Sequence, residues 1–373
     1  MDPRDEGTAA PDGAGGEAGL KPSEIAARLP EYEARLEAAR TSGDRAAEAE
    51  AHEWLAGMRV ATGEVDAGLV HAADAVALRR APGGDAGPLA RALVWQARLA
   101  RGAARAKEAE AAADEAARIA REAGADALVV EADLELAALH EAQARLPEAL
   151  EALRDARARL PALGAIGELP EHDARRGAWP QVWRGLATVQ QGLGAFGPAV
   201  DAFIEVEAWC EQAGDKTGAM MARFAQAPLR EWNGQIKDAL ALWGRVIVDA
   251  RALGAPVVEG QCYAALATFA AREKMTEKAV EWATWARTLA LQNVDPVTYL
   301  HATSVLVDVY DRQGLRVRAV ELLVAARDLL ESSMGREPAD QLLRPVEAGL
   351  KKRWGAATFD ALVASRTKKP DRS

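Results

Sequence analysis

A spacing of about 40 residues between helix-ending turns, typical of repeat proteins, constrains this chain more than any other feature of its sequence. Around Gly194, the turn residue is followed five places later by a small residue, Ala199, and the same pattern recurs along the chain. Self-similarity at a fixed period of roughly 20 to 50 residues is the signature of a repeat architecture. The turn positions, in nearly equal steps, are Gly63, Ala104, Ala144, Gly194, Gly234, Lys274 and Gly314.

The segments on both sides of each turn have the hydrophobic spacing of amphipathic helices. Before Gly194, the residues Trp183, Leu186 and Ala187 lie at positions i, i+3 and i+4, which places them on one face of an α-helix. Glycine at the turn ends that helix. The small residue five places later lets a second helix cross the first closely. Seven helix–turn–helix units are therefore predicted.

The repeat resembles the tetratricopeptide repeat (TPR), a unit of two antiparallel helices with a small residue at the turn. The residues that carry the resemblance are Trp183, Leu186, Ala187, Gly194, Phe196, Ala199 and Phe203 in the fourth unit, and Leu306, Tyr310, Gly314, Ala319, Leu323 and Ala326 in the seventh. The TPR unit has roughly 34 residues, so this chain is more similar to the long units of bacterial signal-sensing solenoids and kinesin light chains. The resemblance implies an all-α, right-handed superhelical solenoid of about seven TPR-like repeats, with a leading helix and C-terminal capping helices.

Changes in composition divide the chain into six segments. The one long step between turns, from Ala144 to Gly194, contains a stretch rich in proline and glycine that predicts a loop. A solenoid also needs polar-backed caps at its ends. We expect a disordered tail over 1–22, a front lobe of a leading helix and three repeats over 23–160, a loop insert over 161–180, a rear lobe of four repeats over 181–335, capping helices over 336–366 and a tail over 367–373.

Composition and charge exclude several classes of protein. The net charge of −10 argues against non-specific binding of nucleic acid, which needs a basic face. The sequence has no run of about 18 apolar residues, so we expect no membrane span. The two cysteines, Cys210 and Cys262, lie in separate repeats and form neither a disulfide framework nor a zinc motif. We therefore expect a cytoplasmic protein.

No local motif predicts catalysis, a cofactor or a metal. Residues 192–197 match the pattern G-x-G-x-x-G, but a helical segment precedes them where a dinucleotide site requires a strand. None of the five histidines lies four residues from another. We therefore expect no catalytic residue, no cofactor, no metal ligand and no enzymatic activity.

The resemblance implies that the helix before each turn lines the concave surface of the solenoid. Polar, charged and aromatic residues on those helices are the candidates for contact with a partner. The alternative is a solvated surface whose charges pair with one another. The candidates are Arg91, Arg98, Arg101, Arg184, Thr188, Gln191, Phe224, Glu231, Trp232, Thr268, Arg272, Asp308, Asp311 and Arg312.

The function that the resemblance implies is that of a non-enzymatic scaffold or adaptor, which binds a partner peptide or segment in a concave groove. We expect that segment to be acidic and to carry a hydrophobic anchor. The alternative is a regulatory sensor that binds a small molecule or a signal peptide. A sensor predicts a closed pocket near Phe224, Pro228 and Trp232, whereas a scaffold predicts an open groove.

Overall fold

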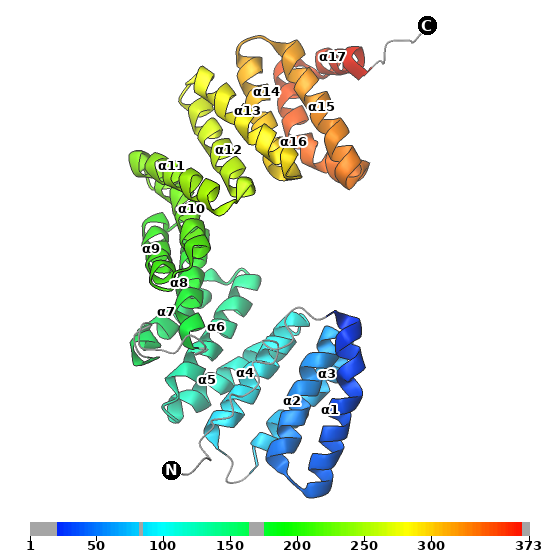
Figure 1. The fold of residues 1–373 in the computed structure, drawn as a ribbon, viewed down its shortest axis with the longest axis vertical. Helices are drawn as coiled ribbons and strands as arrows, with labels where there is room; N and C mark the ends of the chain where they lie inside the picture. Colours follow the sequence, from blue (N-terminus) through cyan, green and yellow to red (C-terminus); the bar gives the residue numbers. More distant parts are fainter. Residues whose placement is uncertain (1–20, 82–84, 164–174, 368–373) are drawn as a thin grey trace. The chain divides into compact units, whose positions relative to one another are not determined.

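The computed structural model describes residues 21–81, 85–163 and 175–367, which fold almost entirely into α-helices (Figure 1). Within these ranges there are seventeen α-helices, one short 3₁₀-helix and no strand. The chain forms two compact units, unit 1 over residues 1–213 and unit 2 over residues 214–373. The all-α fold that the repeat pattern predicts is confirmed.

Both units consist of consecutive helices that pack against their neighbours in the chain. Unit 1 contains α1 (Pro22–Ser42), α2 (Arg45–Ala61), α3 (Val65–Arg79), α4 (Ala86–Gly102), α5 (Ala106–Glu122), α6 (Asp126–Ala142), α7 (Leu146–Arg159), η1 (Leu160–Leu163), α8 (Arg175–Gly192) and α9 (Phe196–Gln212). Unit 2 contains α10 (Lys216–Trp232), α11 (Ile236–Leu253), α12 (Pro256–Arg272), α13 (Thr276–Gln292), α14 (Pro296–Arg312), α15 (Arg316–Met334), α16 (Arg336–Trp354) and α17 (Ala356–Thr367).

All seven predicted turn positions adopt the left-handed backbone conformation. Four of them are glycines, while Ala104, Ala144 and Lys274 reach φ values of 58°, 58° and 59° despite their side chains. At the fourth turn, the N–H of Gly194 donates to the carbonyl of Gln191 at 2.9 Å, so a carbonyl at the helix end keeps a partner. The seven pairs run from α2–α3 to α14–α15, with α1 as the leading helix and α16 and α17 following the last pair.

The small residue five places after each turn is buried at the crossing of the two helices. The alanines at this position are at most 2% exposed: Ala109, Ala149, Ala199, Ala239, Ala279 and Ala319. The first repeat has Gly68 instead, where a Cβ would lie 2.6 Å from Cγ2 of Val60 and 2.8 Å from the carbonyl oxygen of Ala56. The first pair of helices therefore approaches too closely for even an alanine.

Parts of the predicted tails and insert lie outside the described residues, namely 1–20, 164–174 and 368–373. On either side of 164–174, the chain forms η1 and the first turns of α8, which contains Pro180. Pro228, near which a sensor would have its pocket, lies inside α10. Among the described helices, none combines the length and the apolar character that crossing a lipid bilayer requires.

Candidate functional site

The predicted partner-binding residues fall on the first helices of the repeats, in two groups. Those of unit 1 lie on α4 and α8, and those of unit 2 lie on α10, α12 and α14. In unit 2, α12 and α14 contact each other directly as well as through the helix between them. We refer to the solvent-facing side chains of α10, α12 and α14 as the first-helix face of unit 2.

The two predicted aromatic residues of α10 have different environments. Phe224 is half-buried and packs edge-on against the core residue Trp243, with ring centroids 5.5 Å apart. Trp232, at the end of the same helix, is 56% exposed. Met221 is also exposed and lies about three helical turns before Trp232, which places it on the same side of α10. The apolar surface of this helix thus consists of Met221 and Trp232, while Phe224 belongs to the core.

Polar and charged residues of the first-helix face form contacts from one repeat to the next. Arg272 of α12 forms an ion pair with Glu231 of α10 at 2.6 Å, immediately beside Trp232 in the sequence. Thr268 Oγ1 of α12 and His301 Nε2 of α14 are hydrogen-bonded at 2.9 Å. Two bridges of this kind connect three successive first helices, so their spacing is fixed by polar contacts as well as by the core.

The three remaining candidates of unit 2 form a second set of contacts around α14. Arg312 donates to the carbonyl of Ala271 at 2.9 Å and pairs with Asp308 at 2.5 Å. Asp311 accepts from the Arg353 guanidinium at 2.6 Å and from Trp354 Nε1 at 2.5 Å, both in α16. These charges are therefore neutralised inside the unit, as the alternative interpretation of paired surface charges expects.

The candidates of unit 1 are also partly paired. Arg98 and Arg101 of α4 both bind the buried carboxylate of Glu135 in α6, at 2.7 and 2.9 Å. Arg91 of the same helix is exposed. On α8, the three candidates are all exposed, and the Thr188 hydroxyl donates to the carbonyl of Arg184. The third exposed candidate of α8 is Gln191.

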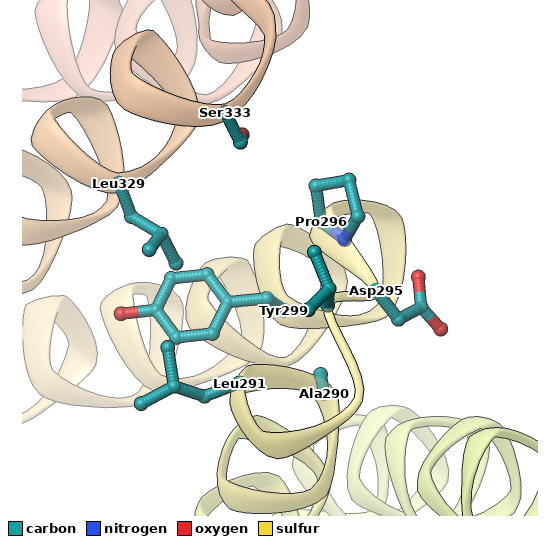
Figure 2. A pocket seen from close by; sticks show the side chains of 8 residues that line it. Ala290, Leu291, Asp295, Pro296, Tyr299, Leu329 and Ser333 are labelled. Carbon is teal, nitrogen blue, oxygen red and sulfur yellow. The ribbon is translucent and has the colours of Figure 1, made fainter.

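A small apolar pocket that the sequence pattern does not indicate lies in unit 2, where α13 ends and α14 begins (Figure 2). The Tyr299 ring lies between Leu291 and Leu329, and Tyr299 Oη accepts from Arg287 at 2.7 Å. Val294, 79% exposed, stands at the rim with a φ of 54°. This conformation is rare for a β-branched residue. The feature of the sequence that could have identified this pocket is a valine one repeat after Gly254, where a glycine is expected.

Two histidines that no motif connects also lie in contact. His52 of α2 and His71 of α3 have their Nδ1 atoms 2.9 Å apart, and Asp74 is the nearest carboxylate to His52. The signal that could have identified them is their distance from the turn at Gly63. Both lie within about three helical turns of it, on helices that must face each other.

Thiol chemistry at the two cysteines is disfavoured by their surroundings. Both Cys210 and Cys262 are fully buried. Burial raises the pKa of the Cys262 thiol to about 12, so this group remains protonated at neutral pH and is a poor nucleophile. The cysteines therefore serve as small apolar core residues.

A scan against models of protein families gave no match, and neither did a sequence search of curated proteins. Solved structures do resemble the chain. A signal-transduction ATPase with a tetratricopeptide repeat sensor from Pyrococcus horikoshii is 12% identical, with a TM-score of 0.55, over 91% of this chain and 52% of that one. BtubC from P. vanneervenii is 16% identical, with a TM-score of 0.53, over 62% of this chain and 92% of that one.

The apo form of the quorum sensor NprR from B. thuringiensis is similar over most of both chains. It is 12% identical, with a TM-score of 0.53, over 91% of this chain and 85% of that one. Similarity at this level of identity shows the fold. The chain is therefore a TPR-like α-helical repeat protein, as its sequence pattern indicates.

Proposed function

We propose that this chain is a non-enzymatic scaffold that binds a segment of a partner protein on the first-helix face of unit 2. The single observation that supports this proposal most strongly is the exposure of Trp232. An exposed tryptophan offers a large, rigid apolar surface, and such residues dominate the binding energy of protein interfaces. Met221 extends the apolar surface along the same side of α10.

The polar surroundings of Trp232 suit the rim of an interface. Glu231 is held by Arg272, whose own side chain remains about half exposed. A partner that covers Trp232 would therefore meet an ordered ion pair, and the exposed edge of the guanidinium could bind a carboxylate of the partner. This arrangement supports the expectation of a segment with a hydrophobic anchor and acidic neighbours.

A regulatory sensor is the second candidate, because the similar structures include a quorum sensor and a tetratricopeptide repeat sensor. The pocket at Tyr299 has a volume of about 120 Å³, below the roughly 300–1,000 Å³ of typical ligand sites. A cavity of about 470 Å³ lies between α1 and α2, where Tyr32, Arg35 and Trp54 line it. A small-molecule sensor would use that cavity of unit 1, whereas the sequence pattern favours the residues around Trp232 in unit 2.

The test is a comparison of two exposed tryptophans in unit 2. Trp232→Ala removes the proposed anchor on a first helix, and Trp285→Ala removes a tryptophan that is 44% exposed on the second helix α13. Tagged proteins are used to capture partners from the native cells, and the captured proteins are quantified by mass spectrometry. We expect a partner whose capture falls at least tenfold with Trp232→Ala and is unchanged with Trp285→Ala. Loss with Trp285→Ala alone would place the interface on the second helices.

A further inference from the structure

A pair of imidazoles lies between α2 and α3 of unit 1. His52 is 1% exposed, and its Nδ1 faces the Nδ1 of His71 at 2.9 Å. Asp74, one turn after His71 on α3, places Oδ2 3.6 Å from His52 Nδ1. One ligand atom from each of the three residues lies within 4.8 Å of the others. Three groups that bind metal ions therefore converge on one point.

The close crossing of α2 and α3 explains why these side chains meet. Gly68 of α3 packs directly on the backbone of Ala56 in α2. His52 lies four residues before Ala56 and His71 lies three residues after Gly68, so each histidine is one helical turn from the crossing. Because the backbones are so close there, the side chains one turn away are pressed against each other.

The two rings face each other through nitrogen atoms that can bind metal. Neutral imidazole is the form that coordinates a metal ion. Two facing Nδ1 atoms can share one proton as a hydrogen bond, or they can both direct their lone pairs at one cation.

We propose that His52, His71 and Asp74 form a binding site for a divalent transition-metal ion, with zinc as the best match. Tetrahedral zinc, with bonds of about 2.0–2.1 Å to nitrogen and oxygen, separates its ligand atoms by about 3.3 Å. The observed separations of 2.9 and 3.6 Å lie on either side of this value. The Asp74 side chain is 51% exposed, so the fourth position faces solvent and can hold water. This site departs from the sequence-based expectation of no metal, which considered only histidines spaced along one helix.

Arg40 provides a sharper test of the same geometry. Its Nη2 lies 3.4 Å from Nε2 of His52, while its Nε donates to Glu48 at 3.1 Å. A neutral imidazole that binds metal through Nδ1 carries its proton on Nε2 and becomes a donor there. Two donors then face each other, so Arg40 opposes metal binding. Arg40→Gln removes this opposing donor, and we expect tighter binding.

The experiment measures zinc binding to the full chain after dialysis against a chelator. Isothermal titration gives affinity and stoichiometry, and cobalt(II) substitution gives the visible spectrum of a tetrahedral N,O site. We expect one ion per chain, bound at least tenfold more weakly by His71→Gln and by Asp74→Asn and more tightly by Arg40→Gln. His301→Gln, in unit 2, is the matched control and leaves the affinity unchanged. Asp74 is exposed, so its variant tests the site without disturbing a buried residue.

A second measurement separates a true site from weak surface binding. An ion held between α2 and α3 binds only the folded repeat, so saturating zinc slows hydrogen exchange of their backbone amides. Protection that is absent in His71→Gln supports the site. If the wild type binds no zinc in the micromolar range, or if His71→Gln and Asp74→Asn bind it as well as the wild type, the proposal is wrong and the two imidazoles share only a hydrogen bond.

Discussion

Helices α5 of unit 1 and α11 of unit 2 occupy the same place in their repeats, and they fill it with very different side chains. Residues of the two helices correspond when they lie equally far from the turns that precede them, at Ala104 and Gly234. Ala113 of α5 corresponds to Trp243 of α11, and both are at most 3% exposed. The neighbouring first helices differ in the same direction, with Val94 in unit 1 where unit 2 has Phe224.

This contrast shows which positions define the repeat. The turn and the small residue five places after it are retained in both helices, as Ala109 and Ala239. The position one turn further along is not defined by size. It accepts alanine or tryptophan as long as the local volume is filled, since protein cores must reach a similar packing density.

The largest effect on stability is expected when a large core side chain of unit 2 is removed. Trp243→Ala leaves a cavity and also removes the edge-on contact with Phe224. We expect a loss of about 3–5 kcal/mol in the free energy of unfolding, measured by urea titration. Hydrogen exchange should show the loss in α10 to α12. Trp285→Ala, at an exposed site, is the control and should cost much less. Equal costs would mean that Trp243 is not a core residue of its repeat.

The repeat architecture could be predicted from sequence because it depends on short-range backbone rules. A residue in the left-handed conformation ends the first helix of each repeat, and a small residue must follow at the helix crossing. Both requirements therefore recur at a fixed spacing in the sequence. Even the turns without glycine, such as Lys274, follow from their spacing. The repeat pattern does not specify the size of the core side chains, because it accepts Ala113 and Trp243 equally at the same position.

The environments of the candidate site residues could not be predicted, because they depend on pairs from different repeats. Arg272 and Glu231 lie on the first helices of successive repeats, and so do Arg98 and Glu135. The two residues of such a pair lie about one repeat apart in the sequence. The repeat spacing therefore limits which residues can pair, but the sequence does not show which of several charged residues form the ion pair. Trp232 and Phe224 likewise lie on the same helix, and only packing against Trp243 distinguishes the core ring from the exposed one.

A second correspondence between the units involves a buried polar residue. In unit 1, Arg121 binds the carboxylate of Asp133 at 2.8 Å; in unit 2, the corresponding Arg251 donates to the hydroxyl of Tyr263 at 2.7 Å. Burial raises the pKa of Asp133 to about 6 even though Arg121 opposes the shift. Burial also raises the pKa of Tyr263, so the phenol stays neutral at ordinary pH. The corresponding positions therefore differ: Asp133 of unit 1 titrates near pH 6, whereas Tyr263 of unit 2 stays neutral at ordinary pH.

The second prediction concerns this difference. A carboxyl whose pKa is raised in the folded state binds its proton more tightly there than in the unfolded chain. The free energy of unfolding should therefore fall by about 3 kcal/mol as the pH rises from about 4 to above 6. Asp133→Asn should remove this contribution to the pH dependence, and Tyr263→Phe should leave it unchanged. Urea titrations at several pH values provide the measurement. An Asp133→Asn variant that keeps the full pH dependence would show that another group is responsible.

The third prediction tests whether the alanine core of α5 is as tightly packed as the tryptophan core of α11. Ala113→Leu adds three carbon atoms to a side chain that is 1% exposed. We expect overpacking that costs about 1–3 kcal/mol, with Ala111→Leu on the exposed side of α5 as the control. Adding Val94→Ala to Ala113→Leu should restore part of the stability, because it returns volume to the same core cluster. No loss in Ala113→Leu would indicate a loosely filled core.

The smallest effect is expected at the turns, where the repeats again differ in sequence and agree in backbone. Gly234 and Lys274 are successive turns of unit 2 with φ values of 78° and 59°. A left-handed conformation costs a non-glycine residue roughly 1–2 kcal/mol. Replacing that residue with glycine removes this cost, but part of the benefit is lost because glycine has more conformational freedom in the unfolded chain. Lys274→Gly should therefore stabilise the chain by about 0.5–1 kcal/mol, and Gly234→Ala should destabilise it by a similar amount. If backbone conformation at the turn alone determines the effect, the two variants shift the temperature of thermal unfolding in opposite directions. A destabilised Lys274→Gly would mean that the Lys274 side chain contributes a contact worth more than the backbone strain.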